Sequence, residues 1–364
     1  MKLNKTLIGL VTGALAVVSA QAQVELVLTG STAFRAIAID RAFSIFDATG
    51  FSGITNDPSS PNLVTYRGTV QGAVPSLGTT PVTLRLGFSG SGSGMLAVKN
   101  LTPVLVADTA GSLTSGNINK TPDIAFSDIY PASATPPIAG TAFERSVLGV
   151  IPFVYVRSAA LTGVNSITRE QAYLLMTASG SIAGIDGMPA TYLGGSSAAP
   201  VYLIGRDSGS GTRITVHKDV GFNGNPTLWA TNGAGAYVLT NGYSSGSNVR
   251  NVVKGKSDAI AWLGLSDALQ IVTNGFASMM AYQGVPYSEP AVANGAYTLW
   301  GYEHVVNRAG ALSANQVKVR NALIYAITNA TFQSTYLYTN ANVRLNQMNV
   351  QRGADGAPPT SLNF

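Results

Sequence analysis

Residues 205–213, GRDSGSGTR, hold the donor groups that an anion-binding site requires. Arg206 stands four residues before a Ser-Gly-Thr triplet, and the apolar segment VYLI (201–204) comes just before it. A guanidinium group offers an oxyanion a rigid fork of N–H donors. The triplet opens an expected helix, whose first N–H groups lack partners inside the helix and carry partial positive charge. The stretch fits a small-residue loop, a turn that holds a nucleophile, or a cradle for an anion.

Two other junctions share this design. Gly30-Ser31-Thr32 follows an apolar segment, and Ser91 lies in the small-residue run SGSGSG (89–94) after another. A single turn of this kind is typical of helix capping, because Ser and Thr cap many helices for structural reasons alone. In open α/β sheets, however, ligands bind beyond the carboxyl ends of the strands, where all three turns are expected. Their convergence with Arg206 would surround a tetrahedral oxyanion with donors and needs no metal or cofactor.

Asp128 closes the segment DIAFSD (123–128), and a carboxylate there would repel a fully ionised anion. An ionised carboxylate only accepts hydrogen bonds, so it suits a ligand that carries a proton, such as a P–OH group. A fully ionised sulfate would face an unmatched charge, and sites built for hydrogen bonding reject such ligands strongly. The alternative is that Asp128 caps a helix or pairs with an arginine elsewhere.

The elements that must position these residues alternate along the chain, which predicts an α/β fold. Strands are expected at 24–28, 82–88, 123–128, 150–156, 201–204 and 258–265. Helices are expected at 33–46, after the SGSGSG run, after Thr168 and after Ser313. Thr168 with Gln171 and Ser313 with Gln316 form two capping boxes. The Gly/Ser/Asn-rich stretches 180–200 and 221–250 are expected to be loops.

Composition narrows the class of protein. The chain has 364 residues, of which 46% are hydrophobic and only 11% charged. Ser, Thr, Asn and Gly must therefore cover much of the surface, a composition common in exported proteins. The formal charge of +5 falls to +3 without Lys2 and Lys5 (20 basic against 17 acidic residues), and no basic run indicates nucleic acid. There is no cysteine, which excludes a disulfide framework and a lipid attached at cysteine.

The first 22 residues read as a signal peptide. Lys2 and Lys5 form a basic region, an apolar run follows, and Ala20-Gln21-Ala22 is an A-x-A cleavage site. The apolar run is short for a membrane span. We therefore expect a protein exported to the periplasm or the extracellular space.

Together these segments resemble the phosphate-binding periplasmic proteins of phosphate ABC transporters and their wider type II relatives. That family shows an arginine four positions before Ser-Gly-Thr, preceded by a G-S-T-like turn, a G-S-G-x-G loop and an "ASD" ending, in the order found here. Asp207, Arg213 and the later SDAIAWLGLSD (257–267) also agree with it. The resemblance covers most of the chain after the expected signal peptide. It implies these ligand-binding residues: Ser31, Thr32, Ser91, Asp128, Arg206, Ser210, Gly211 and Thr212.

The resemblance also implies an architecture and a function. Two lobes, 24–153 plus 299–364 and 154–298, would enclose a cleft and be joined by two crossovers. The expected function is capture of inorganic phosphate, for an ABC transporter permease or as a scavenger, by a monomer without enzyme activity. The first loop is shorter than is usual in the family, so either Ser31 or Thr32 could touch the ligand, and Ser89, Ser91 and Ser93 leave the register of the second loop open.

Other functions compete with phosphate binding. A serine hydrolase needs a base beside its nucleophile, and only His217 and His304 exist. A nucleotide-binding P-loop fails because Arg250 stands where GKS (255–257) needs its first glycine. An exported surface protein that keeps the fold without the ligand, or a binder of another oxyanion such as molybdate, remains an alternative.

Overall fold

The computed structural model describes residues 23–362, apart from 58–59, 109–116, 178–186 and 330–342. The predicted signal peptide, residues 1–22, lies outside the described residues. None of the helices in the described part of the chain is long and apolar enough to cross a membrane.

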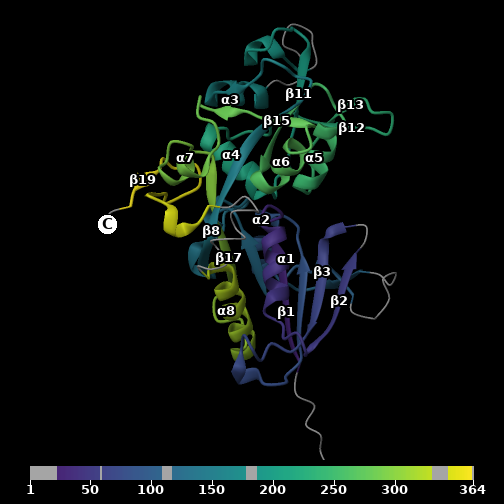
Figure 1. The fold of residues 1–364 in the computed structure, drawn as a ribbon, viewed down its shortest axis with the longest axis vertical. Helices are drawn as coiled ribbons and strands as arrows, with labels where there is room; N and C mark the ends of the chain where they lie inside the picture. Colours follow the sequence, from purple (N-terminus) through teal and green to yellow (C-terminus); the bar gives the residue numbers. More distant parts are fainter. Residues whose placement is uncertain (1–22, 58–59, 109–116, 178–186, 330–342, 363–364) are drawn as a thin grey trace, which may run out of the picture.

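One mixed sheet of eleven strands runs through the molecule, and it confirms the predicted α/β class. Most of its strands alternate in the sequence with helices, which cover its faces (Figure 1). The order is β10 (Met188–Pro189), β11 (Pro200–Ile204), β14 (Ala259–Gly264), β8 (Phe143–Ser158), β17 (Trp300–Arg308), β7 (Ile124–Ser127), β1 (Val24–Gly30), β4 (Val82–Gly87), β3 (Ser60–Gly68) and β2 (Phe51–Asp57), with β15 (Ala277–Met279) paired to β8.

The sheet forms two lobes because β8 changes partners along its length. Its residues up to Pro152 pair with β17, and those from Phe153 onward pair with β14. We call the part with β1, β2, β3, β4 and β7 the first lobe, and the part with β10, β11, β14 and β15 the second lobe. Figure 1 shows β8 and β17 running between them. The two-lobed architecture is therefore confirmed, whereas the exact residue boundaries of the lobes stay a prediction.

Helices cover both lobes (Figure 1), and each buries apolar residues. The two predicted capping boxes are present, with reciprocal hydrogen bonds between Thr168 and Gln171 and between Ser313 and Gln316. The first lobe carries α1 (Arg35–Ser44), α2 (Ser91–Asn100) and α8 (Ala314–Thr328); the second carries α3 (Arg169–Thr177), α4 (Gly211–Val220), α5 (Gly246–Lys254), α6 (Leu265–Val272) and α7 (Glu289–Ala293).

The stretch 221–250 corrects one sequence prediction, because it is not simply a loop. It holds a hairpin of β12 (Leu228–Thr231) and β13 (Tyr237–Thr240), and it enters α5, which Ser245 caps. Leu228 and Trp229 are buried, so packing outweighs the turn-forming residues around them. The remaining short strands are β5 (Val104–Ala107), β6 (Asn117–Lys120), β9 (Ser166–Ile167), β16 (Ala281–Tyr282), β18 (Val350–Gln351) and β19 (Thr360–Ser361).

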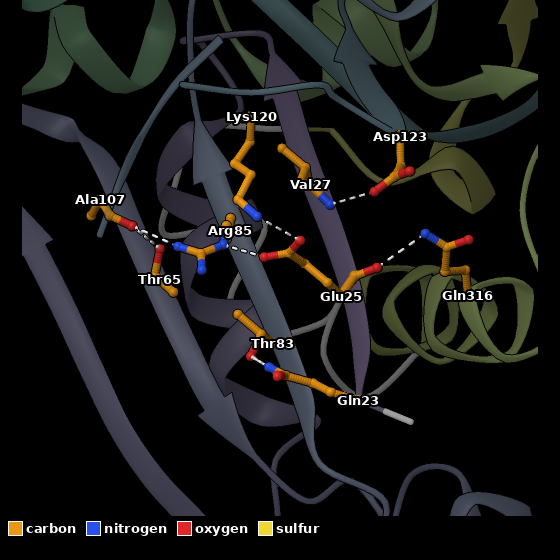
Figure 2. Close-up of polar contacts among 10 residues, drawn as sticks. All are labelled: Gln23, Glu25, Val27, Thr65, Thr83, Arg85, Ala107, Lys120, Asp123 and Gln316. Carbon is orange, nitrogen blue, oxygen red and sulfur yellow. Dashed lines mark hydrogen bonds and ion pairs between the residues drawn. The ribbon is translucent and has the colours of Figure 1, made fainter. Parts of the chain in front are cut away.

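A polar network stiffens the first lobe (Figure 2). The buried Arg85 on β4 donates to Glu25 on β1 and to the carbonyl of Ala107, and Lys120 also pairs with Glu25. Burial alone would raise the pKa of Glu25, but the hydrogen bonds from Arg85 and Lys120 outweigh it and lower the pKa. The carboxylate is therefore ionised at neutral pH, and it ties the β5–β6 hairpin to the sheet.

The C-terminal segment 343–362 contacts both lobes. Val343 exchanges backbone hydrogen bonds with Val150 on β8. The backbone N–H of Asn349 donates to Ala293 on α7, whereas Asp355 accepts from the backbone N–H of Tyr130, just after β7. The segment therefore lies across the junction of the lobes.

Candidate functional site

The predicted ligand residues gather where the two lobes meet. Strands β1, β4 and β7 run parallel, so their carboxyl ends open toward the same edge of the sheet. From the second lobe, β11 leads through the GRDSGSGTR loop into α4. Hydrogen bonds cross between the lobes here, among them one from Arg206 Nη1 to Thr32 Oγ1 at 3.0 Å and one from the Gly92 N–H to the Gly209 carbonyl at 3.0 Å. The structure thus brings the three turns and Arg206 together.

Arg206 is only 2% exposed and is held in a fixed orientation. Its Nε donates to the carbonyl of Tyr243 at 3.0 Å and its Nη2 to the carbonyl of Ser244 at 2.8 Å. With the bond to Thr32, these contacts use three of the five N–H groups of the guanidinium within the described part of the chain. The two remaining N–H groups can face the oxygens of an anion.

Asp128 is 1% exposed and lies directly against the loops of both lobes. Ser91 Oγ donates to its Oδ1, and its own backbone N–H donates to Ser91 Oγ at 3.2 Å. Burial raises the pKa of Asp128, and the Ser91 hydroxyl, the positive charge of Arg206 and the Ser31 hydroxyl oppose that rise. Neither alternative role of Asp128, as a helix cap or as a partner in a remote ion pair, matches these contacts.

The Ser91 contact also distinguishes the three serines of the second loop. Ser89 Oγ lies 3.1 Å from Thr29 Oγ1, and the backbone N–H of Ser93 donates to the Gly209 carbonyl. Of the three hydroxyl groups, that of Ser91 is the one that reaches Asp128.

The N-terminus of α4 faces this carboxylate. Ser210 caps the helix by accepting from the Arg213 N–H at 3.4 Å. At Gly211 a Cβ atom would lie 1.5 Å from Asp128 Oδ1 and 2.7 Å from Ser91 Oγ, so only glycine fits. The positive end of the α4 dipole thus acts on the same small volume as Arg206.

The N-terminus of α2 differs from what the sequence predicts. The N–H groups of Gly92 and Ser93 both donate to the carbonyl of Gly209 across the lobe boundary, at 3.0 and 3.3 Å. A Cβ at Gly209 would meet Ser93 Oγ at 1.9 Å, which explains the glycine. These two amides hold the lobes together and are not free to bind an anion.

Other residues of the site had no motif to mark them. Tyr243 and Ser244 contribute backbone carbonyls, which side-chain identity does not indicate. Burial lowers the pKa of Arg206, and the charges of Asp207 and Asp267 partly oppose that shift. Asp267 itself pairs with Arg250 at 2.8 Å. Glu303 on β17 is completely buried, and its pKa responds to Asp128 and Ser31.

Arg213 has a structural role. Its Nη1 donates to the backbone carbonyls of Arg206 and Asn241, both at 3.2 Å. It therefore fixes the path of the loop that carries Arg206.

The histidines do not support a hydrolase. The ring of His217 packs against Phe222 and Trp262, and that of His304 against Tyr130. Burial lowers the pKa of each to about 3. The chain carries one Gly-x-Ser-x-Gly sequence, GYSSG at 242–246, but its Ser244 supplies a backbone carbonyl to Arg206. In the described part of the chain, no three His, Asp or Glu side chains gather to hold a metal ion.

Comparison with known proteins identifies the fold. No family model matches the sequence, and no curated protein sequence matches it. Solved structures do match. A phosphate ABC transporter substrate-binding protein from Clostridium perfringens, solved with bound phosphate, is 15% identical, with a TM-score of 0.58 over 88% of this chain and 99% of the other.

Two further solved structures agree with this match. An ABC-type phosphate transport receptor from Vibrio cholerae is 14% identical, with a TM-score of 0.52 over 87% of this chain and 99% of the other. The high-affinity periplasmic phosphate-binding protein PfluDING, bound with phosphate, is 13% identical, with a TM-score of 0.53 over 88% and 90%. At these identities the likeness establishes the two-lobed fold, and the structurally similar proteins are binding proteins rather than enzymes.

Proposed function

We propose that this chain is an exported solute-binding protein that captures inorganic phosphate between its two lobes and delivers it, as a monomer, to an ABC transporter permease. One observation carries the proposal. A buried arginine from the second lobe and a buried carboxylate from the first lie at one lobe boundary, together with the N-terminus of α4. The structurally similar proteins named above bind phosphate, which supports the choice of ligand.

In this proposal Arg206 and the N-terminus of α4 bind the oxygens of the anion. Ser31, Thr32, Ser91, Ser210 and Thr212 add hydroxyl groups, and Gly211 lets the helix backbone approach. Asp128, whose carboxylate is favoured by the Ser91 hydroxyl and the charge of Arg206, accepts a hydrogen bond from a P–OH group. Binding bridges the two lobes, so the anion favours the closed arrangement by its extra contacts there.

Calorimetric titration with phosphate, arsenate, sulfate and molybdate tests the proposal. We expect phosphate to bind and sulfate to bind at least tenfold more weakly, because sulfate has no proton for Asp128 at neutral pH. The variant Asp128→Asn should weaken phosphate binding and narrow the gap to sulfate, because an amide can donate as well as accept.

Asp123→Asn is the matched control. Asp123 stands just before β7, whereas Asp128 stands just after it. Like that of Asp128, the pKa of Asp123 is raised, mainly by burial. Its carboxylate accepts from the backbone N–H of Val27 (Figure 2). The substitution Asp123→Asn should leave anion selectivity unchanged. Tight binding of molybdate with none of phosphate would identify another oxyanion as the ligand. Binding of no anion at all would favour a surface protein that keeps only the fold.

A further inference from the structure

Glu303 is a buried carboxyl group that no motif explains. It lies on β17, one of the strands between the lobes, and is 0% exposed. Among the described residues, neither of its carboxyl oxygens has a hydrogen-bond partner of normal geometry. An unpaired buried carboxyl group is costly, so its presence calls for a functional reason.

The side chain of Glu303 faces the anion site. Side chains alternate along a strand, and Tyr302 and His304 both pack toward Tyr130 on one face of β17. Gly301 and Glu303 therefore share the other face. A Cβ at Gly301 would lie 2.8 Å from the Asp128 carbonyl and 3.7 Å from Thr215 Oγ1 on α4, which places that face beside the site.

The surroundings of Glu303 contain one other charge that acts on it. From β8 its register partner is Gly149, which has no side chain. From the end of β7 comes Asp128, and from the end of β1 the uncharged Ser31. The positive charge of Arg206 acts on Asp128, and that of Arg145 acts on His304 on the opposite face. Burial raises the pKa of Glu303 well above its ordinary value, the charge of Asp128 raises it further, and the Ser31 hydroxyl offsets a part.

We propose that Glu303 is a further positioning and specificity-determining residue of the anion site, whose neutral carboxyl group orients Ser31 and Asp128 and whose ionisation weakens anion binding. The inference rests on the proposed function and deepens it. Ser31 is the link between the two carboxyl groups, because its hydroxyl influences the pKa of both. Its backbone N–H donates to the Phe126 carbonyl and its Oγ accepts from the Phe34 N–H at 3.3 Å, so the oxygen is held and the hydroxyl hydrogen can turn.

The charge balance of the site explains the effect. With Glu303 neutral, the positive charge of Arg206 faces the negative charge of Asp128, and Arg206, the donors of α4 and the hydroxyl groups hold the anion. With Glu303 ionised, the buried site carries an extra negative charge next to the ligand. Like charges in such a site repel strongly, so anion affinity falls as the pH passes the pKa of Glu303. Binding above that pH must also take up a proton.

The pH dependence of phosphate affinity tests the proposal with Glu303→Gln, an isosteric substitution that keeps the neutral state at every pH. Between pH 6 and pH 9 the Kd of the wild type should rise. Its fold-increase should exceed that of Glu303→Gln by a factor of ten or more. The ionisation of phosphate itself is common to both proteins and cancels in the comparison. Asp123→Asn should follow the wild-type profile. Parallel profiles for Glu303→Gln and the wild type would overturn the proposal.

A second measurement needs no phosphate. A carboxyl group whose pKa is raised by folding holds its proton longer in the folded state, so it costs stability as the pH rises from its unfolded pKa toward its folded pKa. The urea midpoint of Glu303→Gln should therefore gain relative to that of the wild type, so that their difference increases from pH 5 to pH 9. No gain would show that Glu303 is not a neutral buried acid and would refute the inference. If this gain is seen but the wild type binds no phosphate, the proposed function fails while the assignment of the neutral acid holds.

Discussion

Thr212 and Thr215 lie one turn apart on α4, yet they differ in what they can contact. Both are buried. Thr212 is in the first turn, where the predicted anion lies. Thr215 Oγ1 lies deeper, and among the described residues it has no hydrogen-bond partner. The pair separates the effect of binding from the effect of losing a hydroxyl group.

Thr212→Val should weaken phosphate binding about 10- to 100-fold, because a hydrogen bond to a charged group contributes ~1.5–3 kcal/mol. Thr215→Val should leave the phosphate Kd unchanged and raise the melting temperature, since it removes a buried hydroxyl without a partner. Calorimetry and thermal unfolding of both variants measure these effects. Equal phosphate affinity in the two variants would remove Thr212 from the site.

At this scale, the sequence predicts residues that belong to motifs and misses those that do not. Arg206 and the triplet after it are marked by spacing, and Asp128 by its place after a strand. Tyr243 and Ser244 act through backbone carbonyls, which any residue type supplies. Glu303 lies in WGYEHV (300–305), where nothing in the sequence shows that a glutamate will be buried beside a carboxylate 175 positions earlier in the chain.

The contact between the α4 N-terminus and the end of β7 sets how closely the lobes approach. Gly211→Ala would place a Cβ 1.5 Å from Asp128 Oδ1. Alanine favours a helix more than glycine does, so any loss of phosphate affinity should come from the clash between the lobes. We expect phosphate affinity to fall ~100-fold, as a shift of about 1 Å in a preorganised site typically costs.

Gly233→Ala is the control for this substitution. Gly233 lies in the turn between β12 and β13, where a Cβ would meet nothing within 4 Å. Calorimetry should show wild-type phosphate affinity for Gly233→Ala. Small-angle scattering should show lobes that stand further apart in Gly211→Ala alone. A Gly211→Ala variant that binds and closes normally would contradict the described packing of α4.

A clear apolar pattern in the sequence predicts an element well, whereas an element that forms through tertiary contacts has no such pattern. The buried runs at 24–28, 82–88 and 258–265 each form a strand of the sheet. The segment 150–156 is only the second half of β8, because residues 144–147 in its first half are exposed or half-buried and interrupt the apolar run. The β12–β13 hairpin is hidden among turn-forming residues, and packing of Trp229 against Tyr202 helps to fix it.

On the scale of the whole molecule, Asp355 links the C-terminal segment to the first lobe and makes stability depend on pH. Burial raises its pKa to about 6, partly offset by hydrogen bonds from Ser133 and the Tyr130 N–H. The folded protein therefore keeps this proton between about pH 4 and pH 6 while the unfolded chain loses it, and stability declines with rising pH across that window.

Asp355→Asn should abolish that decline, because its amide can still accept from Tyr130 but does not titrate. Between pH 4 and pH 7 the variant should gain about 3 kcal/mol in the free energy of unfolding relative to the wild type. Urea unfolding at the two pH values measures the difference. A constant difference between variant and wild type would show that Asp355 does not titrate in this window.

The step from Pro152 to Phe153 has a mechanical consequence. Pro152 has no N–H to donate, and at this step β8 exchanges β17 for β14, so bending should concentrate there. The C-terminal segment adds a third tether beside β8 and β17, since it reaches Ala293 on one side and Tyr130 on the other. Three connections restrict the rotation of one lobe relative to the other more than two would. We therefore expect the lobes to open only a little around the proposed anion site, so that release of a bound anion, rather than its entry, would limit the rate of exchange.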